Sequence, residues 1–405
     1  MEFILLTEQE FEQFSINYEN STFLQTTNMA QYQIKNNRIV YFPAVKIENR
    51  IVCASFIFGI KTRMSVYYSC PRGFLIDYNN QELLKYYVEN IKKLLKENNG
   101  YCLNIEPNIL YNQRDINGLK VVNGFNNQYV IDNLLKNGFK HNKISLESDP
   151  NKQVRWTFRL TYDQKDENVV FNNFNSKTKR IIKKAIKSNL EVKEVEYKYL
   201  DKFKLIIDST GERKSFGTRS LKYYQDMYNS FDSQKIKFLA IHLNINKYIS
   251  QIKDDLTKLT SDRNKIEFND KNKKKIIELD NQINSINKRI NIMNELGNKY
   301  PNELMISVGM FLIHKNTTTY LFGGSYDDFM FLNGQYLLQW EIIKYGISNG
   351  CTNHDFYGIT GDLSKENPKY GVYEFKRGFD GCVEEYIGDF DLILKPFVYK
   401  LHKLI

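Results

Sequence analysis

The sequence has few of the features that mark a membrane protein or a nucleotide-cofactor enzyme. Its first apolar run, Phe3 to Leu6, is very short and is flanked by acidic residues, whereas a secretory signal has a basic flank and a longer apolar core. No segment approaches the roughly 20 apolar residues of a membrane span. Neither Gly-x-Gly-x-x-Gly nor a Walker-type glycine loop is present. We therefore expect a cytoplasmic protein without a nucleotide-cofactor fold.

Cysteine and histidine are scarce and dispersed. The five cysteines are far apart, without Cys-x-x-Cys spacing or a nearby histidine pair, so neither a zinc site nor a disulfide framework is indicated. No Ser/His/Asp or Cys/His nucleophilic set is recognisable among the dispersed histidines. We expect reduced thiols, no metal and no covalent catalysis. If the protein is an enzyme, it transfers a group directly between two bound substrates, by positioning and charge stabilisation.

Size and charge set the broad class. With 405 residues, of which 42% are hydrophobic, the chain is long enough to bury two ordinary cores. A formal net charge of +10 favours polyanionic partners. A merely soluble basic protein remains the alternative, because abundant Lys, Asn and Ile also follow from AT-rich coding.

One internal segment, residues 246–297, differs from its surroundings. It has no proline and almost no aromatic residues, and its apolar residues recur in steps of three and four in two runs. The polar stretch Glu267 to Asn272 separates the runs, which favours an antiparallel helical hairpin. A dimerising coiled coil is the competing interpretation.

The remaining halves repeat one local pattern. Gln81 to Glu97 and Gly334 to Ser348 each read as a helix, each followed by Asn-Gly and then by a strand that ends near an acidic residue. In each case we expect the glycine to take the left-handed conformation that closes a helix. Strand-like runs alternate with helices elsewhere, so the sequence predicts a duplicated, mixed α/β or α+β architecture.

The stretch from Asp355 to Asp391 is rich in both glycine and aromatic residues. This mixture is too glycine-rich for a helical core and too aromatic for a disordered tail. We interpret it as short strands and loops that shape a cleft, with Lys376 and Arg377 beside it.

Two basic features precede that stretch. A helix from Asn172 to Ser188 places basic residues on one face, a pattern that contacts phosphates but also occurs on the solvated face of any lysine-rich helix. These residues are Lys177, Arg180, Lys184 and Lys187. Further along, a helix beginning at Arg219 places Tyr223 one turn later, and this pair suits a diphosphate or carboxylate. The alternative is an arginine paired with a local carboxylate beside a half-buried tyrosine.

Several short sequence segments, which we call phrases, together resemble those of the Fem family, the non-ribosomal peptidoglycan aminoacyltransferases that use aminoacyl-tRNA to build interpeptide branches. The resemblance covers almost the whole chain and rests on the order and spacing of these segments. These phrases are Phe23 to Thr26, Tyr68 to Asp77, Asn104 to Pro107, Lys184 to Lys187, Arg213 to Tyr223, Phe356 to Ile359, Tyr370 to Phe379 and Tyr386 to Phe390.

The resemblance implies an α+β protein with two acetyltransferase-like (GNAT) domains, each with a mixed sheet. The first covers 1–152 and the second 153–244 with 298–392. The coiled-coil arm, 245–297, interrupts the second domain, and a C-terminal helix covers 393–405. The acetyl-CoA signature Arg/Gln-x-x-Gly-x-Gly/Ala is missing. That agrees with aminoacyl-tRNA as co-substrate and with no other cofactor.

The resemblance also implies roles for individual residues. Lys376 stabilises the tetrahedral intermediate, and Arg219 with Tyr223 binds the muropeptide precursor. We add Arg213, Tyr326 and Phe375 to the substrate-binding set, and the four basic residues of the 172–188 helix to tRNA binding. Glu106 is the catalytic carboxylate candidate, although a carboxylate before proline also caps turns. Glu106, Glu374 or substrate phosphates accept the proton of the amine.

Two positions depart from the family pattern. Met29 stands where many members have tryptophan, and Gln33 and Lys35 are both candidates for the lysine that usually follows. Contacts from the first domain to the precursor are therefore not assigned.

The sequence thus predicts an aminoacyltransferase that adds an amino acid to the stem peptide of lipid II or its UDP-linked precursor. It acts in the cytoplasm or peripherally at the inner membrane face, alone, as a homodimer or with a paralogue. The alternatives are the same transfer to another amine and a noncatalytic RNA-binding or scaffold protein.

Overall fold

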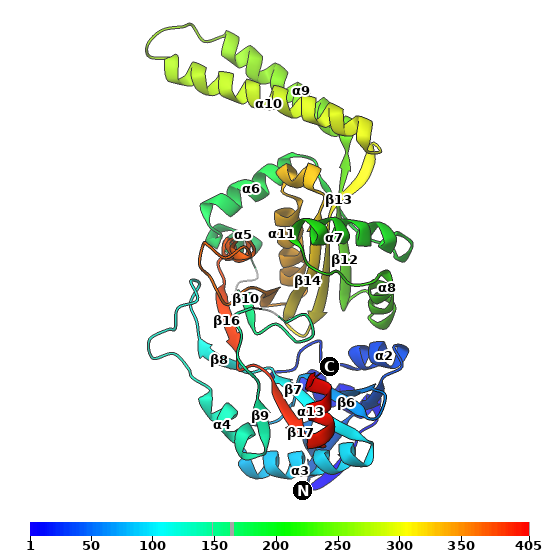
Figure 1. The fold of residues 1–405 in the computed structure, drawn as a ribbon. Coiled ribbons are helices and arrows are strands. Elements are labelled where there is room, and N and C mark those ends of the chain that lie inside the picture. The colour runs from blue at the N-terminus through cyan, green and yellow to red at the C-terminus, as the bar shows by residue number, and fades with distance from the viewer. Residues whose placement is uncertain (148, 163–165, 405) are drawn as a thin grey trace.

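The computed structural model describes residues 1–147, 149–162 and 166–404. Two α/β halves are stacked along the molecule, and a helical arm projects from the far end of the second half (Figure 1). Both ends of the chain lie in the first half. This arrangement leaves the facing ends of the two sheets as the place where both halves contribute side chains.

The first half is built on a six-stranded sheet. In order across it the strands are β2 (Ile39–Tyr41), β5 (Ile57–Lys61), β6 (Val66–Arg72), β7 (Gly100–Pro107), β17 (Phe390–Ile393) and β9 (Phe139–His141). A second, three-stranded sheet is formed by β1 (Glu2–Leu5), β3 (Pro43–Ile47) and β4 (Arg50–Ala54). The helices of this half are α1 (Glu8–Asn17), α2 (Thr27–Lys35), α3 (Gln81–Glu97), α4 (Gln128–Lys136) and, at the C-terminus, α13 (Pro396–Leu404).

Helix α3 shows how sequence determines structure in this half. Asn80 caps its first turn by accepting a hydrogen bond from the N–H of Leu83, and one apolar face is buried against the sheet. We predicted that Gly100 closes the helix, and that prediction was wrong. Asn99 takes the left-handed conformation (φ 59°), which asparagine tolerates, and Gly100 is the first residue of β7. A Cβ at Gly100 would lie 2.7 Å from the carbonyl oxygen of Leu95, so the close approach explains the glycine.

The second half is built on an eight-stranded sheet. In order its strands are β11 (Glu191–Glu194), β12 (Ile236–Asn244), β13 (Glu303–His314), β14 (Thr317–Ser325), β15 (Asn353–Gly358), β10 (Trp156–Thr161), β16 (Cys382–Tyr386) and β8 (Leu110–Gln113). Its helices are α5 (Glu167–Asn173), α6 (Ser176–Lys187), α7 (Leu200–Lys214), α8 (Leu221–Ser230), α11 (Gly334–Ser348) and α12 (Tyr370–Arg377), with short 3-10 turns η1 (Tyr197–Tyr199) and η2 (Asp327–Leu332). Here the left-handed residue after α11 is a glycine, Gly350 (φ 78°), as predicted.

The two halves exchange strands. Strand β8 comes from the range assigned to the first domain but lies at the edge of the second sheet, where it pairs with β16. Strand β17 comes from the range assigned to the second domain but lies between β7 and β9 in the first sheet. The domain boundaries stay a prediction. The exchange and a shared apolar cluster, which includes Phe56 of the first half and Phe238 of the second, join the halves firmly.

The arm consists of α9 (Ile245–Asn264) and α10 (Lys273–Lys299), which pack against each other and reverse direction between them (Figure 1). This confirms the predicted antiparallel hairpin, and the reversal contains the polar stretch that interrupts the heptads. Tyr248, Ile252 and Met293 anchor the base of the arm in the core of the second half. None of the described helices is both long and apolar enough to cross a membrane.

The stretch from Asp355 to Asp391 differs from its prediction in one respect. It contains strands and loops, but it also contains helix α12, which carries Phe375 and Lys376. Tyr373 and Lys376, three residues apart, form the buried face of this helix, and Gly371 lies on the side with no neighbouring atoms. At eight residues the helix is too short for its periodicity to stand out in the sequence.

Candidate active site

The second sheet opens between two parallel strands. β14 and β15 pair only from Thr317 to Thr319 and from Asn353 to Asp355, and beyond that point they diverge. Where they diverge, the register of β15 against β10 shifts, and Tyr357 has the left-handed conformation (φ 62°). This bulge turns the end of β15 and directs the Tyr357 side chain toward the first half. The opening leaves backbone edges of both strands available to a chain entering between them.

Lys376 lies at this opening. Its ammonium donates hydrogen bonds to the carbonyl oxygens of Tyr357 (3.2 Å) and Gly358 (2.5 Å), at the end of β15. The side chain is only 4% exposed. Burial lowers the pKa of Lys376 to about 7, although the nearby carboxylate of Asp355 acts in the opposite direction. An ammonium has three donors, so one remains for a ligand.

Hydrogen bonds through Tyr357 connect Lys376 with Glu106, the two residues that we assigned to catalysis from the sequence. The hydroxyl of Tyr357 donates to the side-chain oxygen of Gln153 (2.8 Å), and the backbone N–H of Gln153 donates to the carboxylate of Glu106 (2.6 Å). Glu106 is the next-to-last residue of β7 in the first sheet, and burial raises its pKa to about 7. Glu106 therefore exchanges a proton near neutral pH, which suits a general base or acid.

Arg219 and Tyr223 lie beside the opening, although not quite as predicted. Ser220 is the N-cap of α8, so Arg219 precedes the helix that we expected it to begin. Its guanidinium nevertheless lies over the Tyr223 ring, 5.6 Å from the centroid. Tyr223 packs edge-on against Phe322 of β14 and against Tyr32 of α2. Arg219 is exposed and has no ion pair with a carboxylate among the described residues, so it is available to an anion.

The other predicted substrate-binding residues make structural contacts. Arg213 forms an ion pair with Asp327, so a local carboxylate already balances its charge. Tyr326 stacks obliquely on Tyr300 at the base of the arm, with ring centroids 6.0 Å apart. Phe375 packs edge-on against Tyr336, 4.7 Å away. Their roles in binding stay predictions.

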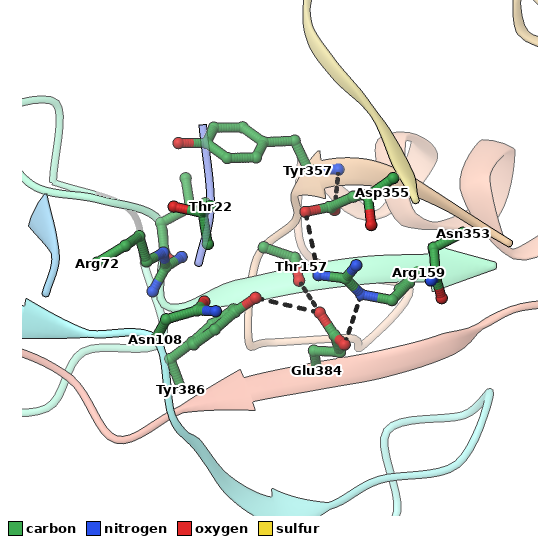
Figure 2. A network of polar contacts seen from close by, with 12 residues as sticks. Thr22, Arg72, Asn108, Thr157, Arg159, Asn353, Asp355, Tyr357, Glu384 and Tyr386 are labelled. Carbon is green, nitrogen blue, oxygen red and sulfur yellow. Dashed lines mark hydrogen bonds and ion pairs between the residues drawn. The ribbon is translucent and has the colours of Figure 1, made fainter. Parts of the chain in front are cut away.

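A polar network next to the opening was missed by the sequence analysis (Figure 2). Arg159 of β10 pairs with Glu384 of β16 (2.7 Å) and with Asp355 of β15 (3.6 Å). Glu384 also accepts hydrogen bonds from the hydroxyls of Thr157 (3.0 Å) and Tyr386 (3.2 Å). These residues come from three adjacent strands whose order only the folded sheet reveals. The sequence feature that could have indicated this network is the presence of charged residues inside otherwise apolar strands.

A family model described as the FemAB family matches residues 6–405. The chain belongs to the FemAB family. This confirms the resemblance deduced from the sequence, and the protein is an aminoacyltransferase of this family.

Individual relatives agree with that assignment. The chain is 28% identical over 414 residues to Aminoacyltransferase FemA of Staphylococcus epidermidis, covering 100% of this chain and 99% of the relative. It is 29% identical over 405 residues to Aminoacyltransferase FemA of Staphylococcus aureus (strain bovine RF122 / ET3-1), covering 98% and 95%.

Solved structures establish the fold. A crystal structure of FemX superimposes with a TM-score of 0.77 at 24% identity, over 99% of both chains. A tandem GNAT protein from the clavulanic acid biosynthesis pathway superimposes with a TM-score of 0.51 at 8% identity, over 97% of this chain and 98% of that one. The FemAB-family chain therefore has the predicted tandem GNAT-like, α+β architecture.

The basic helix of this FemAB-family protein begins later than predicted. Asn175 caps α6, so the helix starts at Ser176, and Ile182 on its apolar face is fully buried. Arg180, Lys184 and Lys187 line a surface hollow of about 670 Å³ together with Lys179 and Lys183. Lys177 is not part of that lining.

No carboxylate among the described residues pairs with a cation of α6. Burial and the neighbouring guanidinium groups of Arg289 and Arg180 lower the pKa of Lys184. The base of the arm, which carries Arg289, therefore adds positive charge to the same surface. Like charges held together without a carboxylate favour an anionic ligand.

Proposed function

We propose that this FemAB-family protein transfers an amino acid from an aminoacyl-tRNA to the side-chain amine of the stem peptide of a peptidoglycan precursor, either lipid II or its UDP-linked form. The opening between β14 and β15, with the Lys376 ammonium at its edge, is the observation that carries the proposal. Support also comes from the aminoacyltransferase names of the FemA relatives and from the absence of an acetyl-CoA signature.

The chemistry needs little beyond positioning and charge. The ester to the tRNA ribose is already activated, so a neutral amine aimed at its carbonyl carbon suffices. A C–N bond forms, the ester C–O bond breaks, and one proton moves from the amine to the departing ribose oxygen. Glu106, with its pKa near 7, accepts that proton and returns it to the ribose oxygen.

Lys376 stabilises the developing negative charge. Two of its three donors hold the carbonyls of Tyr357 and Gly358, and the third is directed to the carbonyl oxygen of the ester. Because the side chain is buried, the interaction with the oxyanion is stronger than in water. The same burial costs free energy when the lysine is charged.

Two cationic surfaces hold the remainder of the substrates. Arg219, exposed beside Tyr223, binds the phosphates of the precursor through its planar guanidinium. The basic hollow of α6 and Arg289 at the base of the arm bind the phosphate backbone of the tRNA. The arm then contributes to the tRNA surface rather than only to a dimer interface.

A reconstituted reaction tests the proposal. The full-length protein is incubated with radiolabelled aminoacyl-tRNAs and, in separate reactions, with lipid II, the UDP-linked precursor, a peptide with a free N-terminus, or a small amine. We expect label to move to lipid II or to the UDP-linked precursor. Transfer only to one of the other amines changes the acceptor, and label that stays on the tRNA throughout contradicts the enzymatic proposal.

A further inference from the structure

A polar cavity of about 350 Å³ lies between the two halves, beside the opening of the second sheet. Figure 2 looks into this region, where Thr22, Arg72 and Asn108 of the first half face the network on β10, β15 and β16. Tyr357 lines the cavity and is also the next-to-last residue of β15, so the cavity adjoins the opening. Its volume lies within the range of small-ligand sites.

Arg72 is the unusual group in this cavity. It ends β6 in the left-handed conformation (φ 55°) and is only 5% exposed. Its guanidinium stacks on the Tyr386 ring at 3.6 Å and donates one hydrogen bond, to the carbonyl oxygen of Val154 (2.7 Å). No ion pair joins it to a carboxylate among the described residues, and Figure 2 marks no hydrogen bond between it and its labelled neighbours. A buried guanidinium with most of its donors available favours an anionic ligand.

The nearby carboxylates form no ion pair with Arg72. Glu106, which lines a neighbouring cavity together with Arg72, accepts the backbone N–H of Gln153 (2.6 Å). Glu384 and Asp355 share Arg159, and Asp355 also accepts the backbone N–H of Tyr357 (2.7 Å). Arg72 and this three-residue network therefore line the cavity as separate charged groups. The rest of the lining is rich in hydroxyl and amide groups that pair with peptide bonds, including Thr317, Thr319, Asn316 and Asn353.

We propose that this cavity binds the carboxylate end of a short peptide, with the Arg72 guanidinium forming a bidentate pair with the terminal carboxylate. The planar fork of arginine matches the two oxygens of a carboxylate, and the Tyr386 ring holds the fork in place. The inference rests on the proposed function for the identity of that peptide, which is the stem peptide of the acceptor. Binding there directs the side-chain amine of the peptide toward the opening.

The test compares two acceptors that differ only at the carboxylate. A synthetic stem pentapeptide and its C-terminal carboxamide are each assayed as acceptors with wild-type protein, Arg72→Lys and Arg72→Gln. We expect the wild type to have a KM at least about tenfold lower for the acid, because a charge-assisted bidentate pair is lost with the amide. Arg72→Lys keeps part of this preference, and Arg72→Gln uses both acceptors equally.

Arg114→Gln is the matched control. Arg114 also lies over an aromatic ring, that of Trp156 at 5.1 Å, and pairs with a buried carboxylate, Glu385 at 2.6 Å. Its loss lowers the thermal midpoint but leaves the preference for the acid unchanged. Equal use of acid and amide by the wild type, or an unchanged preference in Arg72→Gln, would overturn the proposal.

Binding without tRNA separates this proposal from the proposed function. Alanyl-alanine, its amide and free alanine are titrated into the full-length protein by calorimetry. Arg72-dependent binding of the dipeptide acid alone supports the site, even if no transfer is found in the reconstituted reaction. Equal binding of the amide, or equal binding of free alanine, contradicts the assignment to a peptide carboxylate.

Discussion

The two halves contain equivalent parallel strand pairs, and the pairs differ in one respect. In the first half, β6 and β7 stay paired from Val66 and Gly100 to Arg72 and Pro107. In the second half, β14 and β15 separate after Thr319 and Asp355. One half is therefore closed along the whole length of its strands, and the other is open where an acyl chain can enter.

This difference between the strand pairs indicates which functional groups each half contributes to the active site. The closed pair holds Arg72 and Glu106 at its end, where both face the second half. The open pair brings Tyr357 and Lys376 to the place where backbone edges are exposed. We infer that the closed half supplies binding and proton-accepting groups, whereas the open half holds the reacting ester.

The largest expected effect comes from the open pair. Lys376→Met removes the proposed oxyanion donor, and we expect kcat to fall by about a hundredfold to a thousandfold. The fold is retained, since methionine has a similar length. Steady-state transfer and circular dichroism check both points.

Lys369→Met is the control for this change. Lys369 lies one residue before α12, is exposed and pairs with Glu147 at 2.5 Å. We expect it to have near-wild-type activity. Near-wild-type turnover in Lys376→Met would instead refute its catalytic role.

The closed pair is tested by Glu106→Gln, which is expected to lower kcat by about a hundredfold. A base must be ionised, so the wild-type rate rises as pH increases through about 7, the pKa of Glu106. The Lys376 ammonium loses its proton near the same pH, so the rate then falls. The variant should lose the rising limb but keep the falling one. A rising limb at the same pH in the variant would assign the base elsewhere.

A smaller effect is expected away from both strand pairs, on the basic surface. Replacing Arg180 and Lys184 together by glutamine should weaken tRNA binding and reduce the slope of log K against log salt by about 1.4 to 1.8, for two phosphate contacts. Filter binding at several salt concentrations measures this. Lys198→Gln, at an exposed lysine that pairs with Glu196, should not change the slope. Equal slopes for all three proteins would exclude α6 from the tRNA surface.

The smallest effect concerns stability and pH. Lys376 has a folded pKa of about 7 against an ordinary value of 10.5, so between these values the unfolded chain binds the extra proton. The contribution of this lysine to stability therefore improves as pH rises from 7 to 10.5. Lys376→Met lacks this pH-dependent contribution to stability. The thermal midpoint of the variant minus that of the wild type should therefore fall by a few degrees between pH 7 and 9.5. A constant difference would mean that the lysine is not buried as described.

Much of the fold follows from local sequence patterns. The amphipathic period of α3, the heptads of the arm and the repeated helix, Asn-Gly and strand pattern predict elements correctly because each is encoded within a few turns of chain. The exchange of β8 and β17 between sheets was not predictable, because strand pairing depends on contacts far apart in sequence. Helix α12 was missed because eight residues carry too few repeats of the period.

The candidate site was predictable only in part. Lys376 and Glu106 were found through resemblance to a family, and nothing local to either residue indicated that Tyr357 and Gln153 connect them. Arg72 lies within the family-like segment Tyr68 to Asp77, but we assigned it no function from the sequence. Its burial, its left-handed backbone and its aromatic partner arise only when the two halves of the protein meet. Burial also determines the pKa values of Lys376 and Glu106, and a sequence pattern does not report that.

Photo-crosslinking tests most directly whether the open pair holds the reacting ester. A tRNA carrying a photoreactive amino acid through a non-hydrolysable amide is bound to the protein, irradiated, and the labelled peptides are identified by mass spectrometry. We expect labels within 320–325 and 356–358, on the two sides of the opening. Labels confined to 66–72 and 100–107, the closed pair, would contradict it.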